Sequence, residues 1–387
     1  MIEKESIELL KTLVGFDTTS YKSNLELIKF VESYLSDFGI KSKLIYDDTK
    51  KKANLYSIIG PKDVEGIILS GHTDVVSVED QIWDNDPFKL IQNRDKLYGR
   101  GSADMKGFLA LVLSRVPKMT KSNLSKSIHL AFSYDEEIGC LGVHRMLDQI
   151  NIDSINPIFC IVGEPTNMEV VVGHKGKSAH KVDVRGLGYH SGLAPLGVNA
   201  IDYASKLILF INKLMNEKSI NGPFDYDYEI PYTTLHSGII SGGTALNIVP
   251  DLCQFEFEIR YLDKENPEEL LNKIITYAQE NIIPEMHKKS KNTGIYFKEK
   301  ISYPGLSIEH ETKLVKYIKK LLENEKHKKV VFGSEAGLFK NKLNIPTVVC
   351  GPGSIDQAHK ANEYITFDQL EKGGRFLDAL LLSLGDY

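Results

Sequence analysis

Two histidines and several acidic residues stand where this chain would place the ligands of a catalytic metal site. Nearly all of them lie at the end of an apolar run of strand length, or in the loop that follows one. The residues are His72, Asp74, Asp104, Glu136, Glu137, Glu164 and His359. Two imidazoles and three carboxylates without a thiolate suit two Zn²⁺ ions, or Co²⁺ or Mn²⁺, better than a closed structural zinc site.

A single histidine or aspartate after a strand is usually a turn or capping residue, because such side chains favour turns. Likewise, adjacent acids such as Glu136 and Glu137 are usually part of a solvated loop. Here, however, nearly all of the five candidate ligands share one kind of position, at or just after the ends of predicted parallel strands. Sites of α/β folds are built at the carboxyl ends of such strands, and the pattern therefore predicts a single metal-binding site.

The elements that position these residues are short strands alternating with helices. Continuous apolar runs predict buried strands, and apolar residues at helical spacing predict the helices between them. The predicted strands are 43–46, 54–59, 66–69, 127–134, 157–162 and 347–350, and the predicted helices are 5–16, 24–38, 105–115, 142–150, 311–325 and one from 367. Ser23 and Glu26 predict a capping box at the start of the second helix. Such alternation predicts an α/β sheet with crossover helices.

A different pattern begins near residue 176. Predicted strands and helices follow one another there in the order β-α-β-β-α-β, which is the ferredoxin-like arrangement. The segments are strand 178–186, helix 199–215, strands 234–240 and 254–261, helix 266–281 and strand 295–301. We therefore predict an α/β/α domain with a mixed, mainly parallel sheet over residues 1–175 and 304–387, interrupted by an inserted α+β domain at 176–303.

Length and composition agree with a soluble, multi-domain protein and say nothing about its chemistry. The 387 residues correspond to about 2.6 domains, and 42% of them are hydrophobic and 26% charged. The net charge of −5 argues against a nucleic-acid partner. No apolar run approaches the roughly 18 residues of a membrane span. The first six residues do not resemble a secretory signal, and four cysteines without a CxxC pair fit a reducing compartment. We expect a cytoplasmic protein.

Five motifs give the chain a specific resemblance to a known family. They are His72-Thr73-Asp74, Gly99-Arg100-Gly101-Ser102-Ala103-Asp104-Met105-Lys106-Gly107, Asp135-Glu136-Glu137, Gly163-Glu164-Pro165-Thr166 and Gly188-Tyr189-His190-Ser191-Gly192. Together they resemble the co-catalytic metal amidohydrolases, a family that includes acetylornithine deacetylases, succinyl-diaminopimelate desuccinylases, aminoacylases and glutamate carboxypeptidases. The resemblance covers essentially the whole chain. It implies hydrolysis of the amide of an N-acylated amino acid.

The resemblance also implies a role for each residue of the predicted site. His72 and Glu164 would bind one metal ion, Glu137 and His359 the other, and Asp104 would bridge the two. Asp74 would orient the His72 imidazole. Glu136, beside a ligand but free of the metal, would be the general base.

The same resemblance implies roles for three residues of the inserted domain. His190 would reach the active site of a partner subunit and stabilise the oxyanion, which implies a homodimer in which the insert is both lid and dimerisation domain. Asn247 and Arg260 would contact the substrate, the guanidinium of Arg260 gripping a carboxylate. An exposed strand arginine is otherwise usually a surface charge.

Three further stretches resemble the acetylornithine deacetylase branch of the family more than the desuccinylases, namely 224–235, 333–336 and 351–364. The expected reaction is hydrolysis of N2-acetyl-L-ornithine to L-ornithine and acetate, in arginine biosynthesis. Glu335 could pair with the ammonium group of such a substrate, or be a solvated loop acid. A succinyl-diaminopimelate desuccinylase, or a broader N-acyl-amino-acid deacylase, is the alternative. A catalytically silent binding protein on this fold would lack a ligand or the base, and none of these residue types is missing.

Overall fold

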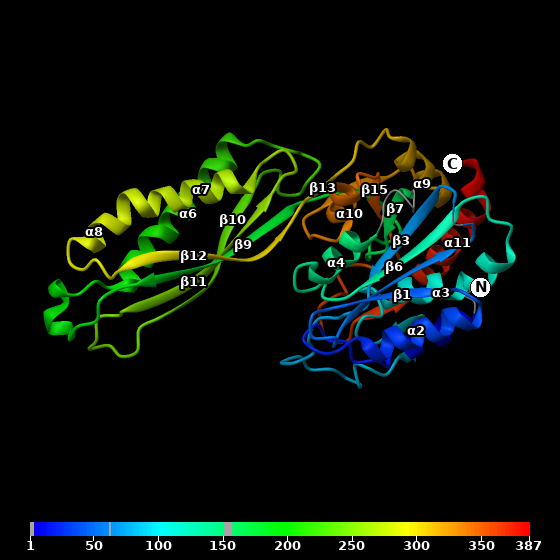
Figure 1. Cartoon of the computed structure of the whole chain (residues 1–387), viewed down its shortest axis with the longest axis horizontal. Helices are drawn as coiled ribbons and strands as arrows, with labels where there is room; N and C mark the ends of the chain where they lie inside the picture. Colours follow the sequence, from blue (N-terminus) through cyan, green and yellow to red (C-terminus); the bar gives the residue numbers. More distant parts are fainter. Residues whose placement is uncertain (1–3, 62, 151–156) are drawn as a thin grey trace. The chain divides into compact units, whose positions relative to one another are not determined.

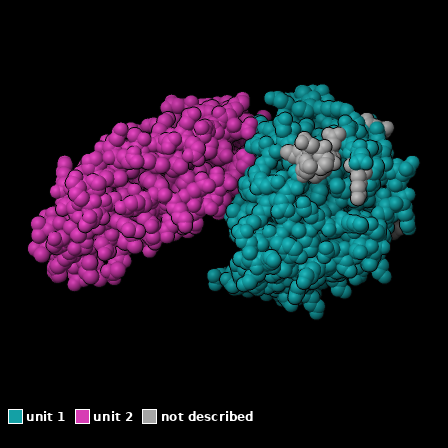
Figure 2. Space-filling model, viewed as in Figure 1, with its two compact units in different colours: residues 1–174, 306–329, 334–387 teal, residues 175–305, 330–333 magenta. Residues whose placement is uncertain are grey.

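The computed structural model describes residues 4–61, 63–150 and 157–387, and the chain divides into two compact units (Figures 1 and 2). Unit 1 comprises residues 1–174, 306–329 and 334–387, and unit 2 comprises residues 175–305 and 330–333. Each unit has a hydrophobic core of its own. Among the described residues, none of the helices has the length and apolar character that crossing a membrane requires.

The main sheet of unit 1 has the strand order β1-β2-β6-β3-β7-β15-β8-β13, and β14 pairs with β8. Its strands are β1 (Ser42–Tyr46), β2 (Ala53–Ile59), β3 (Gly66–His72), β6 (Ser127–Ser133), β7 (Pro157–Val162), β8 (Val170–His174), β13 (Leu306–Ser307), β14 (His327–Val330) and β15 (Thr347–Val349). The central strands β6, β3, β7 and β15 run parallel, while β1, β2, β8 and β13 add antiparallel pairs at the two sides. The predicted mixed sheet with a parallel centre is confirmed.

Helices cover both faces of this sheet. They are α1 (Lys4–Val14), α2 (Leu25–Asp37), α3 (Lys106–Lys121), α4 (Leu141–Gln149), α9 (Lys313–Leu322), α10 (Ala336–Leu343) and α11 (Phe367–Ser383), with a short 3₁₀ turn η3 (Leu384–Asp386) at the end. Helices α1, α2, α3, α9 and α11 contribute to one continuous core with the sheet. Helices α4 and α10 pack against each other and against β2, β6, β7 and β15. Along β7, Phe159 and Ile161 belong to the core that these five helices share, whereas Cys160 and Val162 do not. Because successive side chains of a strand point to opposite faces of the sheet, α4 and α10 cover the other face.

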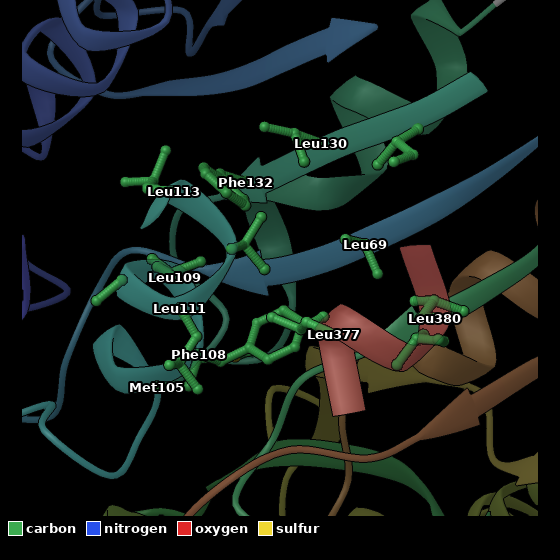
Figure 3. Close-up of a cluster of buried hydrophobic side chains, with 14 of the residues drawn as sticks. Leu69, Met105, Phe108, Leu109, Leu111, Leu113, Leu130, Phe132, Leu377 and Leu380 are labelled. Atoms are coloured by element: carbon green, nitrogen blue, oxygen red, sulfur yellow. The ribbon is translucent and has the colours of Figure 1, made fainter. Parts of the chain in front are cut away.

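The centre of the larger core lies between α3, α11 and the parallel strands, and Figure 3 shows side chains from these elements converging there. Leu69 of β3 and Phe132 of β6 belong to the same buried cluster as Phe108 and Leu109 of α3 and Leu377 of α11 (Figure 3). All five are almost completely buried. Fully burying one such side chain stabilises the fold by about 1.5–3 kcal/mol, so this packing fixes β3 and β6, whose ends carry candidate ligands.

A second, three-stranded sheet of unit 1 has the order β16-β5-β4. Its strands are β4 (Ile91–Asn93), β5 (Lys96–Tyr98) and β16 (Tyr364–Thr366). The pairing of Tyr364 with Tyr98 brings the segment after His359 beside the segment that leads to Asp104. Two candidate ligands far apart in sequence are thereby carried by neighbouring backbone.

Unit 2 has the predicted β-α-β-β-α-β order and an antiparallel sheet of order β10-β11-β9-β12. Its elements are β9 (Gly176–Arg185), η1 (Ser191–Leu196), α6 (Ala200–Asn221), β10 (Thr234–Gly242), β11 (Leu252–Tyr261), α7 (Pro267–Tyr277), η2 (Ala278–Ile282), α8 (Ile283–His287) and β12 (Gly294–Tyr303). Numbered within the unit, the strand order is 2-3-1-4, which is that of a ferredoxin-like domain. Helices α6, α7 and α8 lie on one face of the sheet (Figure 1).

Two local predictions have different outcomes. Asn266 caps α7 by accepting a hydrogen bond from the Glu268 N–H, and Pro267 opens the helix, as predicted. The capping box of Ser23 is wrong, because α2 begins at Leu25 with Asn24 as its N-cap. The Asn24 side chain instead bonds the backbone of Ala53 and the Thr73 hydroxyl, so it ties α2 to the sheet near His72.

Candidate metal centre

Four neighbouring strands carry the candidate ligands at or beyond their carboxyl ends. Glu136 and Glu137 follow β6, His72 is the last residue of β3, Glu164 follows β7, and His359 lies in the loop after β15. These strands are parallel and adjacent in the order β6-β3-β7-β15 (Figure 1). Their carboxyl ends therefore share one edge of the sheet, and side chains from distant parts of the sequence meet there.

Asp104 lies between the two histidines and faces both. Its Oδ1 is 3.1 Å from Nε2 of His72, and its Oδ2 is 3.2 Å from Nε2 of His359. Oε2 of Glu164 is 3.7 Å from the same His72 nitrogen, and Oε2 of Glu137 is 3.0 Å from that of His359. The cluster thus has two halves that share Asp104, one with His72 and Glu164 and the other with His359 and Glu137.

The two halves differ in how firmly the chain holds their histidines. His72 ends a strand that is paired on both sides, and its side chain is 1% exposed. His359 lies in a loop, its side chain is 50% exposed, and its backbone has the left-handed φ of +61°. The His359 half therefore faces solvent, and its position depends on the contacts of a loop.

Asp74 contacts the backbone of the acidic pair more closely than it contacts the imidazole. Its Oδ1 accepts a hydrogen bond from the Glu136 N–H at 3.1 Å, and its Oδ2 accepts from the Glu137 N–H at 3.3 Å and the Ser20 hydroxyl at 2.8 Å. Nδ1 of His72 is 2.9 Å from the Asp74 carbonyl oxygen and 3.6 Å from its carboxylate. The carboxylate therefore fixes the Glu136–Glu137 dipeptide, and the carbonyl oxygen orients His72.

The cluster holds more acidic than basic groups, and burial makes their ionised forms costly. Burial and the neighbouring Asp104 raise the pKa of Glu137 to about 7, and burial also raises that of Glu164. Asp104 and Glu137 in turn raise the pKa of His359 to about 11. Burial opposes ionisation of Asp104, but the two histidines lower its pKa below the usual value. Bound cations would supply the positive charge that these carboxylates lack.

Two ligand atoms of the cluster have no hydrogen-bond partner in the part of the chain that the structure describes. Oε1 of Glu137 and Oε1 of Glu164 are buried and accept no hydrogen bond from the residues that the structure describes. Two sets of atoms, from His72, Glu136 and Glu164 and from His72, Asp104 and Glu137, each lie within 4.8 Å of one another. Unsatisfied buried oxygens beside imidazole nitrogens fit a divalent cation such as Zn²⁺.

Glu136 differs from its neighbour in its contacts. Its Oε1 accepts a weak hydrogen bond from the Cys140 thiol at 3.4 Å, and burial together with Glu164 raises its pKa well above the usual value. The geometry places one of its oxygens within reach of His72 and Glu164. Glu136 is therefore positioned either as a ligand or, as predicted, as a base beside the metal.

Glu335 is buried, and it is not a solvated loop acid. It precedes α10, is 1% exposed, and neither carboxylate oxygen has a close hydrogen-bond partner among the described residues. Burial raises its pKa to about 8, although the Ser133 hydroxyl and His72 favour its ionised form.

The three remaining predicted residues belong to unit 2, and their roles stay predictions. His190 pairs with Ile248, and the neighbouring Ser191 N–H bonds the carbonyl oxygen of Asn247. His190 and Asn247 are therefore side by side and exposed.

Arg260 lies elsewhere in unit 2, toward the end of β11. Its guanidinium contacts the Glu258 carboxylate at 3.1 and 3.2 Å and donates to the Tyr303 hydroxyl at 3.0 Å. The arginine is therefore held in place by the protein, and a substrate carboxylate would compete with Glu258 for it.

Two residues beside the cluster are not among the predicted site residues. Glu363 and Arg100 are each 1% exposed and form an ion pair of 2.8 Å. Glu363 also accepts hydrogen bonds from the backbone of Gly101, Ala103 and Asp104. Arg100 lies in the motif 99–107 and Glu363 in the stretch 351–364, both of which the sequence analysis names. Their opposite charges are the signal from which an ion pair could have been predicted.

The α/β fold and the histidine–carboxylate cluster together define a metal-dependent amidohydrolase. The sequence model of peptidase family M20/M25/M40 matches residues 68–383, and the chain belongs to this family, which confirms the resemblance drawn from the motifs.

Relatives with known names agree with this membership. An acetylornithine deacetylase of Buchnera aphidicola subsp. Schizaphis graminum (strain Sg) is 33% identical over 93% of this chain and 91% of its own length. One of Pasteurella multocida (strain Pm70) is 30% identical over 96% and 94%. The crystal structure of an M20 family metallo-carboxypeptidase from Sulfolobus solfataricus shares the fold, with a TM-score of 0.77, 19% identity and coverage of 98% and 99%.

Proposed function

We propose that this chain hydrolyses N2-acetyl-L-ornithine to L-ornithine and acetate, with two divalent ions, Zn²⁺ or Co²⁺. The observation that carries the reaction is the position of Asp104, whose two oxygens each face a histidine. The substrate rests on the acetylornithine deacetylase relatives, which are 30–33% identical over more than nine-tenths of the chain. The reaction would serve arginine biosynthesis, and a cytoplasmic location agrees with four buried, unpaired cysteines.

In this proposal, His72 and Glu164 hold one ion, Glu137 and His359 hold the other, and Asp104 contacts both. When bound, such ions acidify a water molecule and polarise the scissile carbonyl group. The contacts of Asp74 with the peptide groups of the acidic pair keep Glu137 in position as a ligand.

Glu136 moves the proton. Its carboxylate takes a proton from the attacking water as the new C–O bond forms, and it delivers that proton to the nitrogen of the leaving amine as the C–N bond breaks. The Cys140 thiol, 3.4 Å from Oε1, orients the carboxylate for both transfers. The second proton of the water passes from the new carboxylic acid to the amine, so the products are acetate and the α-ammonium group of the amino acid, and the base returns to its starting state.

The geometry of unit 2 supports a homodimer. Hydrogen bonds continue the β9–β11 ladder past Leu252 to the His190–Ile248 pair, whereas Arg260 lies near its other end, opposite Lys177. From Leu252 to Arg260 alone, a strand rises about 26 Å, which is several times the length of an acylated amino acid. If His190 and Arg260 both contact one substrate, they must come from two subunits.

An exposed apolar surface lies at the same end of unit 2 as His190. Strand β10 is an edge of the sheet, and the large apolar side chains around it are strongly exposed. They are Leu193, Leu196, Ile239, Ile240, Leu246 and Ile248. Unpaired edge strands with apolar side chains associate readily, so we propose that a second copy covers this surface. Ile240→Lys should shift the chain from dimer to monomer in analytical ultracentrifugation; an unchanged mass would exclude this surface.

The substrate contacts can be tested separately. We propose that Arg260 and Asn247 contact the acylated amino acid, and that Glu335 pairs with a cationic side chain that enters the cluster. Glu335→Gln should raise KM for acetyl-ornithine while leaving KM for acetyl-methionine, which has a neutral side chain, within about twofold. An equal rise for both substrates would remove Glu335 from specificity.

A panel of N-acylated amino acids tests the proposed function as a whole. The chain, loaded with Zn²⁺ or Co²⁺, should have its highest kcat/KM for N2-acetyl-L-ornithine, and chelation should abolish the activity until metal is returned. A preference for succinyl-diaminopimelate would favour the desuccinylase alternative, and similar values across the panel would favour a broad deacylase. Activity that survives chelation would contradict metal dependence.

A further inference from the structure

The loop that carries Asp104 is held by one buried carboxylate. Oε1 of Glu363 accepts hydrogen bonds from the Ala103 and Asp104 N–H groups at 2.9 and 3.0 Å, and Oε2 accepts from the Gly101 N–H at 2.9 Å. Nη1 of Arg100 contacts the same Oε2 at 2.8 Å. A buried carboxylate is stable only when its oxygens are paired, and these four contacts fix the backbone at Asp104.

Arg100 also contacts the loop that carries the second histidine. Its Nη1 is 3.4 Å from the Lys360 carbonyl oxygen, and its Nη2 donates to Oε1 of Gln81 at 2.6 Å. The planar guanidinium presents its donors in a fixed fork. One buried side chain therefore links the Asp104 loop, the Gln81 loop and the His359 loop.

Gln81 completes the link to His359. Its Nε2 donates to the His359 carbonyl oxygen at 3.2 Å, while its Oε1 accepts from Arg100 and, at 3.2 Å, from Nε1 of Trp83. Two donors on Oε1 leave the amide only one orientation, with Nε2 toward His359. The Trp83 ring also covers the guanidinium, 5.0 Å from its centre, which stabilises the arginine in this position.

The two histidines depend on this network to different degrees. His72 is part of β3 and is positioned by strand pairing and by the Asp74 carbonyl oxygen. His359 lies in a half-exposed loop with a left-handed backbone, and its carbonyl group is bonded by Gln81. Loss of the network should therefore release His359 and leave His72 in place.

We propose that Arg100 and Gln81 are positioning residues that set the His359–Glu137 half of the cluster, so that cation binding there depends on both residues, whereas binding at the His72–Glu164 half does not depend on Gln81. This inference rests on the proposed function, because it assumes that the two halves bind cations. Neither residue touches the reacting atoms. Their effect passes through the backbone of His359 and, for Arg100, also through Glu363 to Asp104.

Titration of the chelated full-length chain with Zn²⁺ by calorimetry tests this inference. Gln81→Leu removes all three hydrogen bonds of the amide at a partly buried position, and Gln81→Glu keeps the acceptor for Arg100 and Trp83 but removes the donor to His359. We expect two cation sites in the unmodified chain. We expect the His359–Glu137 half to be the weaker site, because its histidine lies in a half-exposed loop. In both variants this site should lose about 10- to 100-fold in affinity, and the His72–Glu164 site should be unchanged.

Arg115→Met is the matched control for Arg100→Met. Arg115 is also a buried arginine, and it contacts Asp378 and the Ser6 hydroxyl away from the cluster. Both variants should lower the melting temperature, but only Arg100→Met should weaken cation binding at the His359–Glu137 half.

Four outcomes are decisive. If both Gln81 variants keep two sites of unchanged affinity, or if Arg115→Met weakens the His359–Glu137 site as much as Arg100→Met, the inference is wrong and the proposed function stands. A single cation site in the unmodified chain would also overturn it. An unmodified chain with two sites that hydrolyses none of the acylated amino acids would overturn the proposed function instead.

Discussion

Replacement of Asp74 by asparagine should weaken catalysis without removing bulk from the site. The Asp74 carboxylate accepts three hydrogen bonds, one on Oδ1 and two on Oδ2, from Glu136, Glu137 and Ser20. Asparagine keeps the shape but replaces one oxygen with an N–H₂ group, which cannot accept. Whichever way the amide is turned, at least one peptide N–H of the acidic pair then faces a donor.

The size of the effect follows from that lost acceptor. A buried polar group without a partner costs about 1–3 kcal/mol, and every 1.4 kcal/mol corresponds to a factor of ten. If the Glu136–Glu137 dipeptide moves to relieve the cost, returning it to the productive position requires the same free energy. We therefore expect kcat/KM for acetyl-ornithine to fall by roughly 5- to 150-fold, which overlaps the range typical of residues that support metal ligands.

Asp47→Asn is the matched control. Asp47 also accepts hydrogen bonds from two consecutive peptide groups, those of Lys51 and Lys52 at 2.8 and 2.9 Å, but it lies in a surface turn. The assay measures release of the α-amine under saturating Zn²⁺, together with metal content by mass spectrometry. The control should stay within twofold of the unmodified chain. An Asp74→Asn variant that also stays within twofold would refute the reasoning, because the contacts would then not position the dipeptide.

Three further predictions concern Glu136, Gly163 and Glu335. Glu136→Gln should lower kcat by about 10²–10⁴-fold with metal content unchanged; lost metal would make Glu136 a ligand. Gly163→Ala places a methyl group 2.1 Å from the Phe108 ring, so the melting temperature should fall by an amount corresponding to about 1–3 kcal/mol. Burial raises the pKa of Glu335 from 4.5 to about 8. The folded, chelated chain thus keeps a proton that the unfolded chain releases, and urea unfolding should show stability decreasing from pH 5 to pH 8, less so in Glu335→Gln.

The main elements of the fold could be predicted because their apolar patterns are long and regular. The runs at β3, β6 and β7 predict buried parallel strands, and the strict alternation of β11 predicts a half-buried one. By contrast, β8 and α10 were not predicted. The apolar run of β8 (Val170–His174) stops after three valines at Gly173-His174, and α10 (Ala336–Leu343) spans only about two helical turns, too few for its period to emerge.

The candidate site was predictable in its residue types but not in its supporting contacts. Positions after strand ends and the family motifs indicate the seven residues of the cluster, the two histidines included. That Asp74 holds peptide groups, that Arg260 pairs with Glu258, and that Glu363 holds the Asp104 backbone depend on side-chain directions and on loop paths. Sequence spacing alone does not contain these, because each contact joins segments whose approach is set by tertiary packing.

The place of β15 in the sheet has a consequence for how the chain is made. β7 and β8 are consecutive in sequence, yet β15 lies between them, and Thr347–Val349 pairs with both. A ribosome that adds about 5–20 residues per second needs roughly 10–30 seconds to proceed from His174 to Thr347. During that interval the facing edges of β7 and β8 have no strand between them, while unit 2, complete in its own sequence, can already fold. The nascent chain is therefore most exposed to aggregation and to chaperones just before its last forty residues are made.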